Sequence, residues 1–504
     1  MIRKPQEYIE SLNDGRVTYY LGEQVPDVTK QPLLRGSINR AALDWVMAND
    51  ARYRDLVTEV DEDGERVNFL WRQPRTAEEL LRQRDIFVLS CRIGFGIGQN
   101  CHAMGVHAFL AAGVVAAKMD KKIGTHYMDA VESYRRYLQK KDIALTGAIT
   151  DPKGDRSLHP SMQKQHKDFY VRVVDKRKDG IVVRGAKMHI SAIATCNEVI
   201  VSPCRAHREE DKDYAVVFAT PLNAKGITCI HMPMTANAAG GEEADWDYPL
   251  HGNTATTTET LLVFDDVFVP WEKVFMCGEW QFSRDIAWAF GTYHRLYSIS
   301  HTVAESELIT GAACLIAEYN GLEKYGHIQD KLAWLAMYAE ETDVLSKAAC
   351  SYPDVDPETG LAVPNLVYTN IAKYKFANER SEALKILADI AGGIASTVPC
   401  FKDWKNSNIR KYLDKYLAAK DGVPTEHRLR VIRMVKELTV GGGYGTAAVM
   451  NAEGSLAAQK MAIYKGSDWE RYKAAAKRLA RIPGWEDHSL FKGVPDPRKP
   501  GYWE

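Results

Sequence analysis

The feature that most constrains the fold is a change of hydrophobic periodicity along the chain, from helical to extended and back to helical. From about Thr76 to Gln139, apolar and charged residues alternate at helical spacing, which predicts a layer of amphipathic helices. Between about Lys141 and Pro270, short β-branched runs are separated by Gly, Asp and Pro. From about Trp288 onward, helical periodicity returns in segments long enough for a bundle. We therefore expect an α+β chain with a β domain between two helical regions.

The length of the chain allows several domains. With 504 residues and 45% hydrophobic content, two or three cores can form, and we expect domains over residues 1–140, 141–275 and 276–504. The expected strands are FYVRVVDKR, GIVVRGAKMHISAI, EVIVSPC, YAVVFATPL, GITCIHMP and ETLLVFDDVFVP. The run SYPDVDPETGLAVPN is expected to be a surface loop between bundle helices because it is rich in Pro, Asp and Gly.

Charge and cysteine usage narrow the functional classes. The formal net charge is -1, so no overall basic field favours nucleic acid. The N-terminus is polar, and we expect neither a secretory signal nor an apolar run of the roughly 18 residues that a membrane span requires. Nine cysteines without a CxxC pair suit reduced thiols. The expectation is a cytoplasmic protein that binds neither nucleic acid nor membrane.

Two glycine-rich stretches invite a nucleotide-binding interpretation, namely Gly94, Gly96 and Gly98, and the run from Gly441 to Gly445. A dinucleotide fingerprint needs a preceding strand and a following helix, so that a pyrophosphate meets the helix N-terminus. Neither stretch has that context. Close helix packing or a tight turn is the better interpretation.

The segment GAITDPKGDRS, Gly147–Ser157, lies where the helical layer gives way to the β domain. Lys153 and Arg156 suit contacts with a phosphate, Gly154 allows close backbone approach, and Asp155 is able to pair with either cation. An ordinary solvated turn is the alternative.

His294 and His301 are seven residues apart and therefore lie on one face of a helix. Together with Cys101 they suggest a metal site. The spacing lacks the tighter pattern of dedicated zinc motifs, and buried histidines with satisfied hydrogen bonds are the commoner outcome.

Small residues interrupt two helical segments near the C-terminus, DIAGG at Asp389–Gly393 and AEGS at Ala452–Ser455. Glycines there permit a ligand to approach the backbone. A helix C-cap or a helix start explains them equally well.

Seven blocks, in order, resemble one family: GAITDPKGDRS, VVRGAKMHISA, EEDKDYAVVFATP, VFDDVFVPWEKVFMCGEW, TYHR, ADIAGGIASTVP and AEGSLAAQKMAIYKG. From about Pro5 to Ile482 the chain is similar to the 4-hydroxyphenylacetate 3-hydroxylase and 4-hydroxybutyryl-CoA dehydratase family, and its wording is closer to the dehydratase. The resemblance implies an acyl-CoA-dehydrogenase-like fold with an N-terminal helical domain, a central β-barrel domain and a C-terminal four-helix bundle, assembled as a homotetramer.

The resemblance also implies a bound FAD, or reduced flavin, between the β domain and the helices. The residues that it places at the flavin are Lys153, Gly154, Asp155, Arg156, Ser191, Gly454 and Ser455. Asp389, Gly392 and Gly393 would lie near the flavin of the partner subunit. The substrate pocket would be lined by the Cys91–His107 segment and the His294–His301 helix.

Departures from the family pattern weigh against two of its activities. The dehydratase holds a [4Fe-4S] cluster with three cysteines and a histidine, and here Cys101 and His294 match while Ile97 and His301 replace two ligands. Isoleucine cannot ligate iron, so we do not expect an ordinary cluster. The metal hypothesis then reduces to an altered centre at Cys101, His294 and His301.

Other departures concern proton transfer. The dehydratase tyrosine aligns with Ser298, although Tyr297 is adjacent, and its C-terminal glutamate aligns near Ala448. The hydroxylases place a histidine where this chain has Gly147.

These observations leave three hypotheses. The first is a two-component monooxygenase, in which a flavin reductase supplies reduced flavin, the substrate is a phenol, and His294, His301, Tyr297 and Cys101 are the catalytic candidates. The second is a flavin-dependent acyl-CoA dehydratase or Δ-isomerase that uses the same residues to move protons. The third is an inactive, flavin-binding family member.

Overall fold

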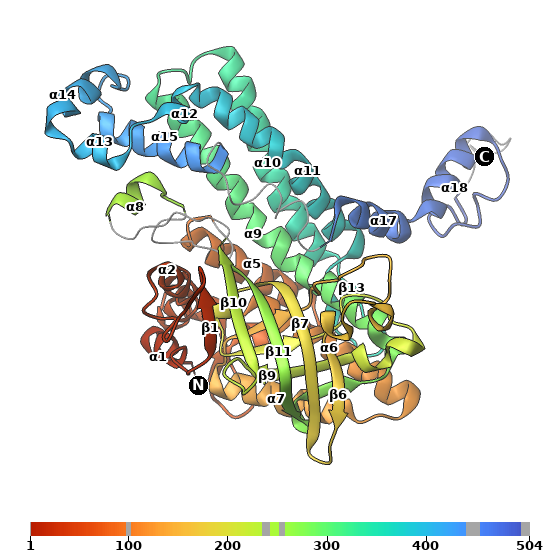
Figure 1. Cartoon of the computed structure of the whole chain (residues 1–504). Coiled ribbons are helices and arrows are strands. Elements are labelled where there is room, and N and C mark those ends of the chain that lie inside the picture. Colours follow the sequence, from red (N-terminus) through yellow and green to blue (C-terminus); the bar gives the residue numbers. More distant parts are fainter. Residues whose placement is uncertain (1, 97–101, 234–241, 251–257, 440–453, 495–504) are drawn as a thin grey trace.

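The computed structural model describes residues 2–96, 102–233, 242–250, 258–439 and 454–494 (Figure 1). The order of element types follows the predicted change of periodicity, and the chain has an α+β architecture. Helices dominate the first third: α1 (Pro5–Ser11), α2 (Pro32–Ala41), α3 (Leu43–Asn49), α4 (Arg54–Val57), α5 (Ala77–Ile93), α6 (Ala103–Ile123) and α7 (Tyr127–Lys141).

The N-terminal region is not wholly helical, in contrast to the expectation for residues 1–140. It contains β1 (Val17–Tyr20), β2 (Glu23–Gln24), β3 (Thr58–Val60) and β4 (Arg66–Asn68). The run VTYY forms a strand because its β-branched and aromatic residues suit a half-buried sheet edge, with Thr18 and Tyr20 buried. β1 pairs in parallel with β10 of the central region. The three domain boundaries stay a prediction.

Two sheets form the central region. The larger has the order β2-β1-β10-β11-β7-β6, and the smaller has the order β12-β9-β8-β5. The six expected strands are confirmed. Their bounds, with the unexpected β5 and β12, are β5 (Leu145–Ala148), β6 (Arg172–Lys176), β7 (Gly180–Ser191), β8 (Glu198–Val201), β9 (Val216–Pro221), β10 (Ile227–Pro233), β11 (Thr258–Pro270) and β12 (Val274–Cys277).

Helix α6 links the sheets to the rest of the molecule, because it packs against both β5 and α9 (Ser283–Tyr319). At its first turn, a Cβ on Gly105 would lie 2.1 Å from the carbonyl oxygen of Leu145, so only glycine permits this approach. By length and composition α6 passes the test for a membrane span, contrary to expectation, yet 78% of its apolar window is buried inside the protein. It is a buried core helix.

The last part of the described chain is helical. Helices α9, α10 and α11 run side by side, and α15 packs against α9 and α11 (Figure 1). The helices are α8 (Glu242–Asp247), α9, α10 (Gly326–Ser351), α11 (Leu366–Ala391), α12 (Ile394–Thr397), α13 (Phe401–Lys405), α14 (Ser407–Tyr416), α15 (Thr425–Thr439), α17 (Leu456–Gly466) and α18 (Trp469–Ala480). The expected loop between α10 and α11 is confirmed, and it carries the short pair β13 (Asp354–Val355) and β14 (Ala362–Val363).

Short 3-10 helices punctuate the connections: η1 (Phe69–Trp71), η2 (Pro160–Met162), η3 (Lys167–Phe169), η4 (Ile193–Thr195), η5 (Glu209–Tyr214), η6 (Trp271–Lys273) and η7 (Trp280–Phe282).

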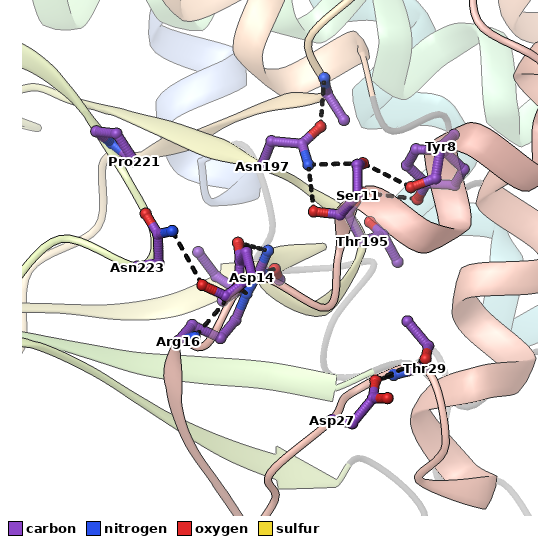
Figure 2. Close-up of polar contacts among 12 residues, drawn as sticks. Tyr8, Ser11, Asp14, Arg16, Asp27, Thr29, Thr195, Asn197, Pro221 and Asn223 are labelled. Atoms are coloured by element: carbon purple, nitrogen blue, oxygen red, sulfur yellow. Dashed lines mark hydrogen bonds and ion pairs between the residues drawn. The ribbon is translucent and has the colours of Figure 1, made fainter.

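The N-terminal segment is tied to the turn that follows β7 (Figure 2). The Tyr8 hydroxyl donates a hydrogen bond of 2.7 Å to the carbonyl oxygen of Thr195, and Arg16 Nη1 donates one of 2.9 Å to that of Ile193. Asn197 Nδ2 donates to Ser11 Oγ at 2.9 Å. These bonds hold η4, directly after the last residues of β7.

The two described glycines of the first glycine-rich stretch have structural roles. Gly94 caps α5, its N–H bonded to the carbonyl of Ser90 at 2.9 Å. Gly96 has a φ of +77°, and a Cβ there would lie 3.0 Å from Leu308. The prediction of tight turns and close packing is confirmed for both residues.

Candidate functional site

One end of the paired strands β7 and β11 carries a half-buried glutamate, Glu259, whose Oε2 atom is buried. Ser191, the last residue of β7, lies opposite Glu259 of β11, and its Oγ donates a hydrogen bond of 2.8 Å to Glu259 Oε1. Glu259 Oε2 is buried without a hydrogen-bond partner in the described part of the chain. Burial raises the pKa of Glu259 to about 7, although the bond from Ser191 opposes this. The carboxyl group therefore changes charge near neutral pH.

The backbone next to Ser191 is fixed from two sides. Thr146 Oγ1 of β5 donates a hydrogen bond of 3.2 Å to the carbonyl oxygen of Ser191. The next residue, Ala192, has a φ of +64°, which is unfavourable for alanine. The bond from Arg16 to Ile193 then holds the following residue. Ser191 and its partner Glu259 thus lie on a rigid support.

A second group of side chains is a cluster of rings between α5, α6 and α9, which we call the ring cluster: Phe87, His107, Phe290, His294, Tyr297 and His301. Along α9, the ring centroids of His294 and Tyr297 are 5.8 Å apart, and those of Tyr297 and His301 are 5.4 Å apart. The two histidines share one face, as predicted. His107 of α6 lies 5.7 Å from His294. The three imidazoles are buried, while Tyr297 and Phe290 are half-buried.

Helix α6 connects the ring cluster to the sheet edge. His107 faces α9, whereas Met104 and Ala108 contact β5 at Gly147. A Cβ on Gly147 would lie 3.1 Å from Met104 Cγ and 3.2 Å from Ala108 Cβ. A large side chain at position 147 would therefore collide with α6.

Gly147 and Ala148 belong to β5, so the predicted loop begins after them. Within that loop, a Cβ on Gly154 would lie 2.5 Å from Gln163 Oε1 and 3.0 Å from Phe169. Packing within the protein is therefore enough to require glycine at this position.

The charged residues of this loop behave differently from one another. Asp155 Oδ1 accepts hydrogen bonds from the N–H and hydroxyl of Ser157, at 2.9 and 2.7 Å. The expected pairing of Asp155 with Lys153 or Arg156 was wrong, because the carboxylate closes its own turn. In the described part of the chain, neither Lys153 nor Arg156 forms an ion pair. Both cations are available to a phosphate.

Gly454, the first described residue of the AEGS segment, lies against Arg295 of α9, next to the ring cluster. Ser455 is the N-cap of α17, its Oγ accepting a hydrogen bond of 3.3 Å from the N–H of Ala458, which confirms the helix-start interpretation. Gly454 has a φ of +100°, and a Cβ there would lie 3.2 Å from Arg295 Nη2. Contact with a flavin stays a prediction for both residues.

Asp389, Gly392 and Gly393 lie at the other end of the helical region. α17 packs on the start of α11, where a Cβ on Gly466 would lie 2.8 Å from Val367. Asp389 is in the last turn of α11 and pairs with Lys331. Arg380 of α11 pairs with Glu305, one turn after His301, and Asp389 lies nine residues further along the helix, about 14 Å away, so one chain does not bring these residues to the ring cluster. Gly392, with a φ of +73°, follows the helix as a C-cap, as one interpretation predicted.

Several predicted residues lie outside the described part of the chain: Ile97, Gly98, Cys101, the run Gly441–Gly445, and Ala448. Within the described ranges, no three His, Cys, Asp or Glu side chains are grouped so as to hold a metal ion. The altered metal centre, which needs Cys101, stays a prediction.

Sequence reasoning missed Glu259, and it included His107 only as the end of a segment expected to line the substrate pocket. Glu259 lies at the start of an apolar strand. A single charged residue at that position is usually interpreted as a strand end exposed to solvent. Its partner Ser191 had already been predicted to lie at the flavin. A prediction that the strands of Ser191 and Glu259 pair would therefore have identified Glu259.

Comparison with known proteins supplies a family context. Residues 4–276 match the family described as 4-hydroxyphenylacetate 3-hydroxylase N terminal, and residues 283–481 match its C-terminal counterpart. A 4-hydroxybutyryl-CoA dehydratase/vinylacetyl-CoA-Δ-isomerase from Clostridium aminobutyricum is 33% identical over 96% of this chain and 100% of its own length. The oxygenase component of a 4-hydroxyphenylacetate 3-monooxygenase from Thermus thermophilus is 30% identical over 88% and 89%.

Solved structures agree with these matches. An oxygen-tolerant archaeal 4-hydroxybutyryl-CoA dehydratase from N. maritimus superimposes with a TM-score of 0.87 at 30% identity, covering 96% of each chain. The oxygenase component of a 4-hydroxyphenylacetate 3-monooxygenase complexed with FAD superimposes with a TM-score of 0.83 at 27% identity, covering 95% of this chain and 98% of its own.

Proposed function

Because the chain belongs to the 4-hydroxyphenylacetate 3-hydroxylase family, which includes 4-hydroxybutyryl-CoA dehydratase, we propose that it is a flavin-using enzyme that acts on a short acyl-CoA. The proposed reaction is that of a dehydratase or of a Δ-isomerase that moves a carbon–carbon double bond. This choice reverses the order of the first two hypotheses drawn from the sequence.

The observation that carries the proposal is the buried carboxyl group of Glu259 with a pKa of about 7. Removing a proton from the carbon next to a thioester needs a base that is ionised at the working pH and still basic. An ordinary exposed glutamate is ionised but too weak a base. Because the carboxyl group of Glu259 is buried beside Ser191, its carboxylate is a stronger base than that of an exposed glutamate and is still ionised near neutral pH.

The crowding at Gly147 supports the same choice. The resemblance places a histidine of the phenol hydroxylases at this position, and here the Cβ alone would already contact Met104 and Ala108 of α6. This chain therefore has no space for such a histidine without a shift of α6, which favours acyl-CoA chemistry over phenol hydroxylation.

Flavin binding fits the residues present. Among the described residues, Lys153 and Arg156 have no ion-pair partner and suit the FAD phosphates, and Glu259 Oε2 is a buried acceptor without a hydrogen-bond partner. We propose that Ser191, Gly454 and Ser455 complete this site. The bound flavin would supply electron transfer to and from the substrate. Since Ile97 and His301 replace two cysteine ligands, we propose that the enzyme works without a [4Fe-4S] cluster.

The remaining proton transfers fall to the ring cluster. In a Δ-isomerisation, Glu259 takes a proton from one carbon and an acid returns a proton at another, with no net oxidation. His294 and His301 suit the second role, because imidazoles exchange protons near neutral pH. The half-buried rings of Tyr297 and Phe290 form an apolar wall that excludes water from the substrate.

We further propose that the protein works as a cytoplasmic homotetramer, in which Asp389, Gly392 and Gly393 lie near the flavin of the partner subunit. In this tetramer each subunit would keep the order seen here, with an N-terminal region of helices and short strands, two central sheets and a C-terminal helical region.

The test uses FAD-loaded protein with vinylacetyl-CoA and, separately, 4-hydroxybutyryl-CoA. We expect formation of the conjugated 2-butenoyl thioester, detected by chromatography, and a loss of about 10²- to 10⁴-fold in the Glu259→Gln variant. Absence of product from both thioesters would refute the proposal.

A monooxygenase remains the second candidate, because the Thermus oxygenase component is 30% identical over most of the chain. Protein supplied with reduced flavin, oxygen and 4-hydroxyphenylacetate tests it. Hydroxylated product, with no reaction of either thioester, would favour this candidate.

A further inference from the structure

His107 is a fully buried histidine whose hydrogen-bonding groups are unused. Its side chain is 0% exposed, and neither ring nitrogen has a hydrogen-bond partner in the described part of the chain. Its nearest ring neighbours are Phe87, at 5.4 Å between centroids, and His294, at 5.7 Å. Burial and the neighbouring His294 hold the pKa of His107 well below its usual range, so the imidazole is neutral and carries one N–H donor and one acceptor.

A fold retains such a group only for a reason, because buried polar groups are almost always paired. The edge-on contact with Phe87, with an interplanar angle of 71°, offers at most a weak interaction of an N–H with a ring face. Phenylalanine or leucine would fill the same space without the loss of hydrogen bonds to water. The unused donor therefore indicates a partner that is present only during function.

The position of His107 within the ring cluster indicates what that partner is. Exposure falls from His301, at 9%, through His294, at 4%, to His107, at 0%, while Tyr297 and Phe290 border the surface. His107 is thus the most deeply buried of the three imidazoles of the ring cluster. Through α6 it is also connected to β5, which supports Ser191 and Glu259.

We propose that His107 contacts the substrate and donates its ring N–H to the carbonyl oxygen of the acyl thioester. This assignment rests on the proposed function. When Glu259 removes the neighbouring proton, negative charge develops on that oxygen, and a donor already desolvated and fixed in place stabilises it. A neutral imidazole suits this role, since it donates a hydrogen bond without giving up its proton.

The test compares His107→Phe with the wild-type enzyme, and uses Phe109→Leu as the control. Phe109 is a buried ring on the same helix, outside the ring cluster. We expect His107→Phe to lower kcat for the thioester about 10²- to 10³-fold, to leave FAD affinity unchanged, and to raise the thermal midpoint. Phe109→Leu should lower the thermal midpoint and leave kcat unchanged.

A binding measurement isolates the carbonyl contact. Butyryl-CoA, which carries the carbonyl but cannot lose a hydroxyl group or shift a double bond, should bind His107→Phe about tenfold more weakly than wild type. Free CoA should bind both proteins equally. A lower thermal midpoint in His107→Phe, or unchanged kcat and butyryl-CoA affinity, would overturn the assignment alone. An inactive wild-type enzyme would instead refute the proposed function, and the assignment with it.

Discussion

At the scale of single residues, a property is predictable from the sequence when it depends only on residues close by in the chain. His294 and His301 were predicted to share a helix face because their spacing fixes it, and α9 confirms this. The pKa of Glu259 is not local, since it depends on burial between strands and on Ser191, 68 residues away in the chain. His107 was expected only as part of the pocket-lining segment Cys91–His107, because its burial against α9 is not local either.

The pH dependence of activity follows from the pKa of Glu259. Its value in the folded protein, about 7, lies above the ordinary 4.5 because burial disfavours the charged form. If the carboxylate is the base, kcat/KM should rise with pH and level off above about 7. The acidic limb of the pH–rate profile measures this. Glu259→Asp, whose shorter carboxylate is closer to water, should move the limb to lower pH, whereas an unmoved limb would assign it to another group.

The same shift predicts the pH dependence of stability. The unfolded chain ionises this group near pH 4.5 and the folded protein near 7, so its contribution is fully present below 4.5 and is lost as pH rises through 7. The loss is at most about 3 kcal/mol. Glu259→Gln keeps an acceptor for Ser191 and cannot ionise, so at pH 8 it should unfold at higher denaturant concentration than wild type, and at pH 4 it should not.

Gly147 offers a prediction about packing. Gly147→Ala places a Cβ against Met104 and Ala108 at 3.1 to 3.3 Å, and we expect a loss of about 1–3 kcal/mol. Gly311→Ala is the control, because a Cβ there meets nothing within 4 Å in the middle of α9, and alanine should stabilise that helix by about 1 kcal/mol. Denaturant unfolding measures both. Equal stability of Gly147→Ala and wild type would show that α6 shifts to accommodate the added methyl group at little cost in free energy.

At the scale of elements, periodicity was sufficient for long elements and insufficient for short ones. The six expected strands and the loop between α10 and α11 are present. β1 and β5 were missed although β8, equally short, was predicted; each of the two pairs in parallel with a strand distant in the chain, β10 or β8, and that pairing is not a local property.

The N-terminal segment should affect the site through the turn that follows β7. Arg16 pairs with Asp14 and donates to the carbonyl of Ile193, two residues after Ser191 (Figure 2). In Arg16→Met, the carbonyl and Asp14 lose this partner, at a cost of about 2–4 kcal/mol. The strained backbone at Ala192 then relaxes, water reaches Glu259, and the acidic limb of the pH–rate profile should move toward lower pH.

The control for Arg16→Met is Asp27→Ala. Asp27 closes a neighbouring turn through the N–H and hydroxyl of Thr29 and makes no bond to η4 (Figure 2). Asp27→Ala should lower the free energy of unfolding without shifting the acidic limb of the pH–rate profile. If neither variant shifts the acidic limb of the pH–rate profile, the N-terminal segment stabilises the fold but does not affect the pKa of Glu259.

At the scale of the whole molecule, the resemblance to the family predicted that Asp389, Gly392 and Gly393 lie near the flavin of a partner subunit. A motif shows which residues belong together in function, whereas the length of α11 decides that they lie far from the ring cluster within one chain. If these residues contact a flavin beside the ring cluster, the proposed partner subunit must bring them there, and this contact stays a prediction.

Gly393 allows this arrangement to be tested. A Cβ on Gly393 meets nothing within 4 Å, and its φ of −60° suits any residue, so Gly393→Leu should fold normally. If the flavin of the partner lies against Gly393, the leucine should block it, lowering FAD affinity at least tenfold and abolishing activity. Gly326→Leu is the matched control, since a Cβ at Gly326 also meets nothing within 4 Å, and it should bind FAD normally.

Mixed oligomers then decide whether the site is shared. Gly393→Leu keeps Glu259, and Glu259→Gln keeps Gly393, so a site built from one subunit of each kind is intact. Co-expression of the two inactive variants should restore activity to about a quarter of the wild-type value, if subunits pair at random across a twofold interface. Normal FAD affinity and normal activity of Gly393→Leu alone would instead place the whole site within one chain.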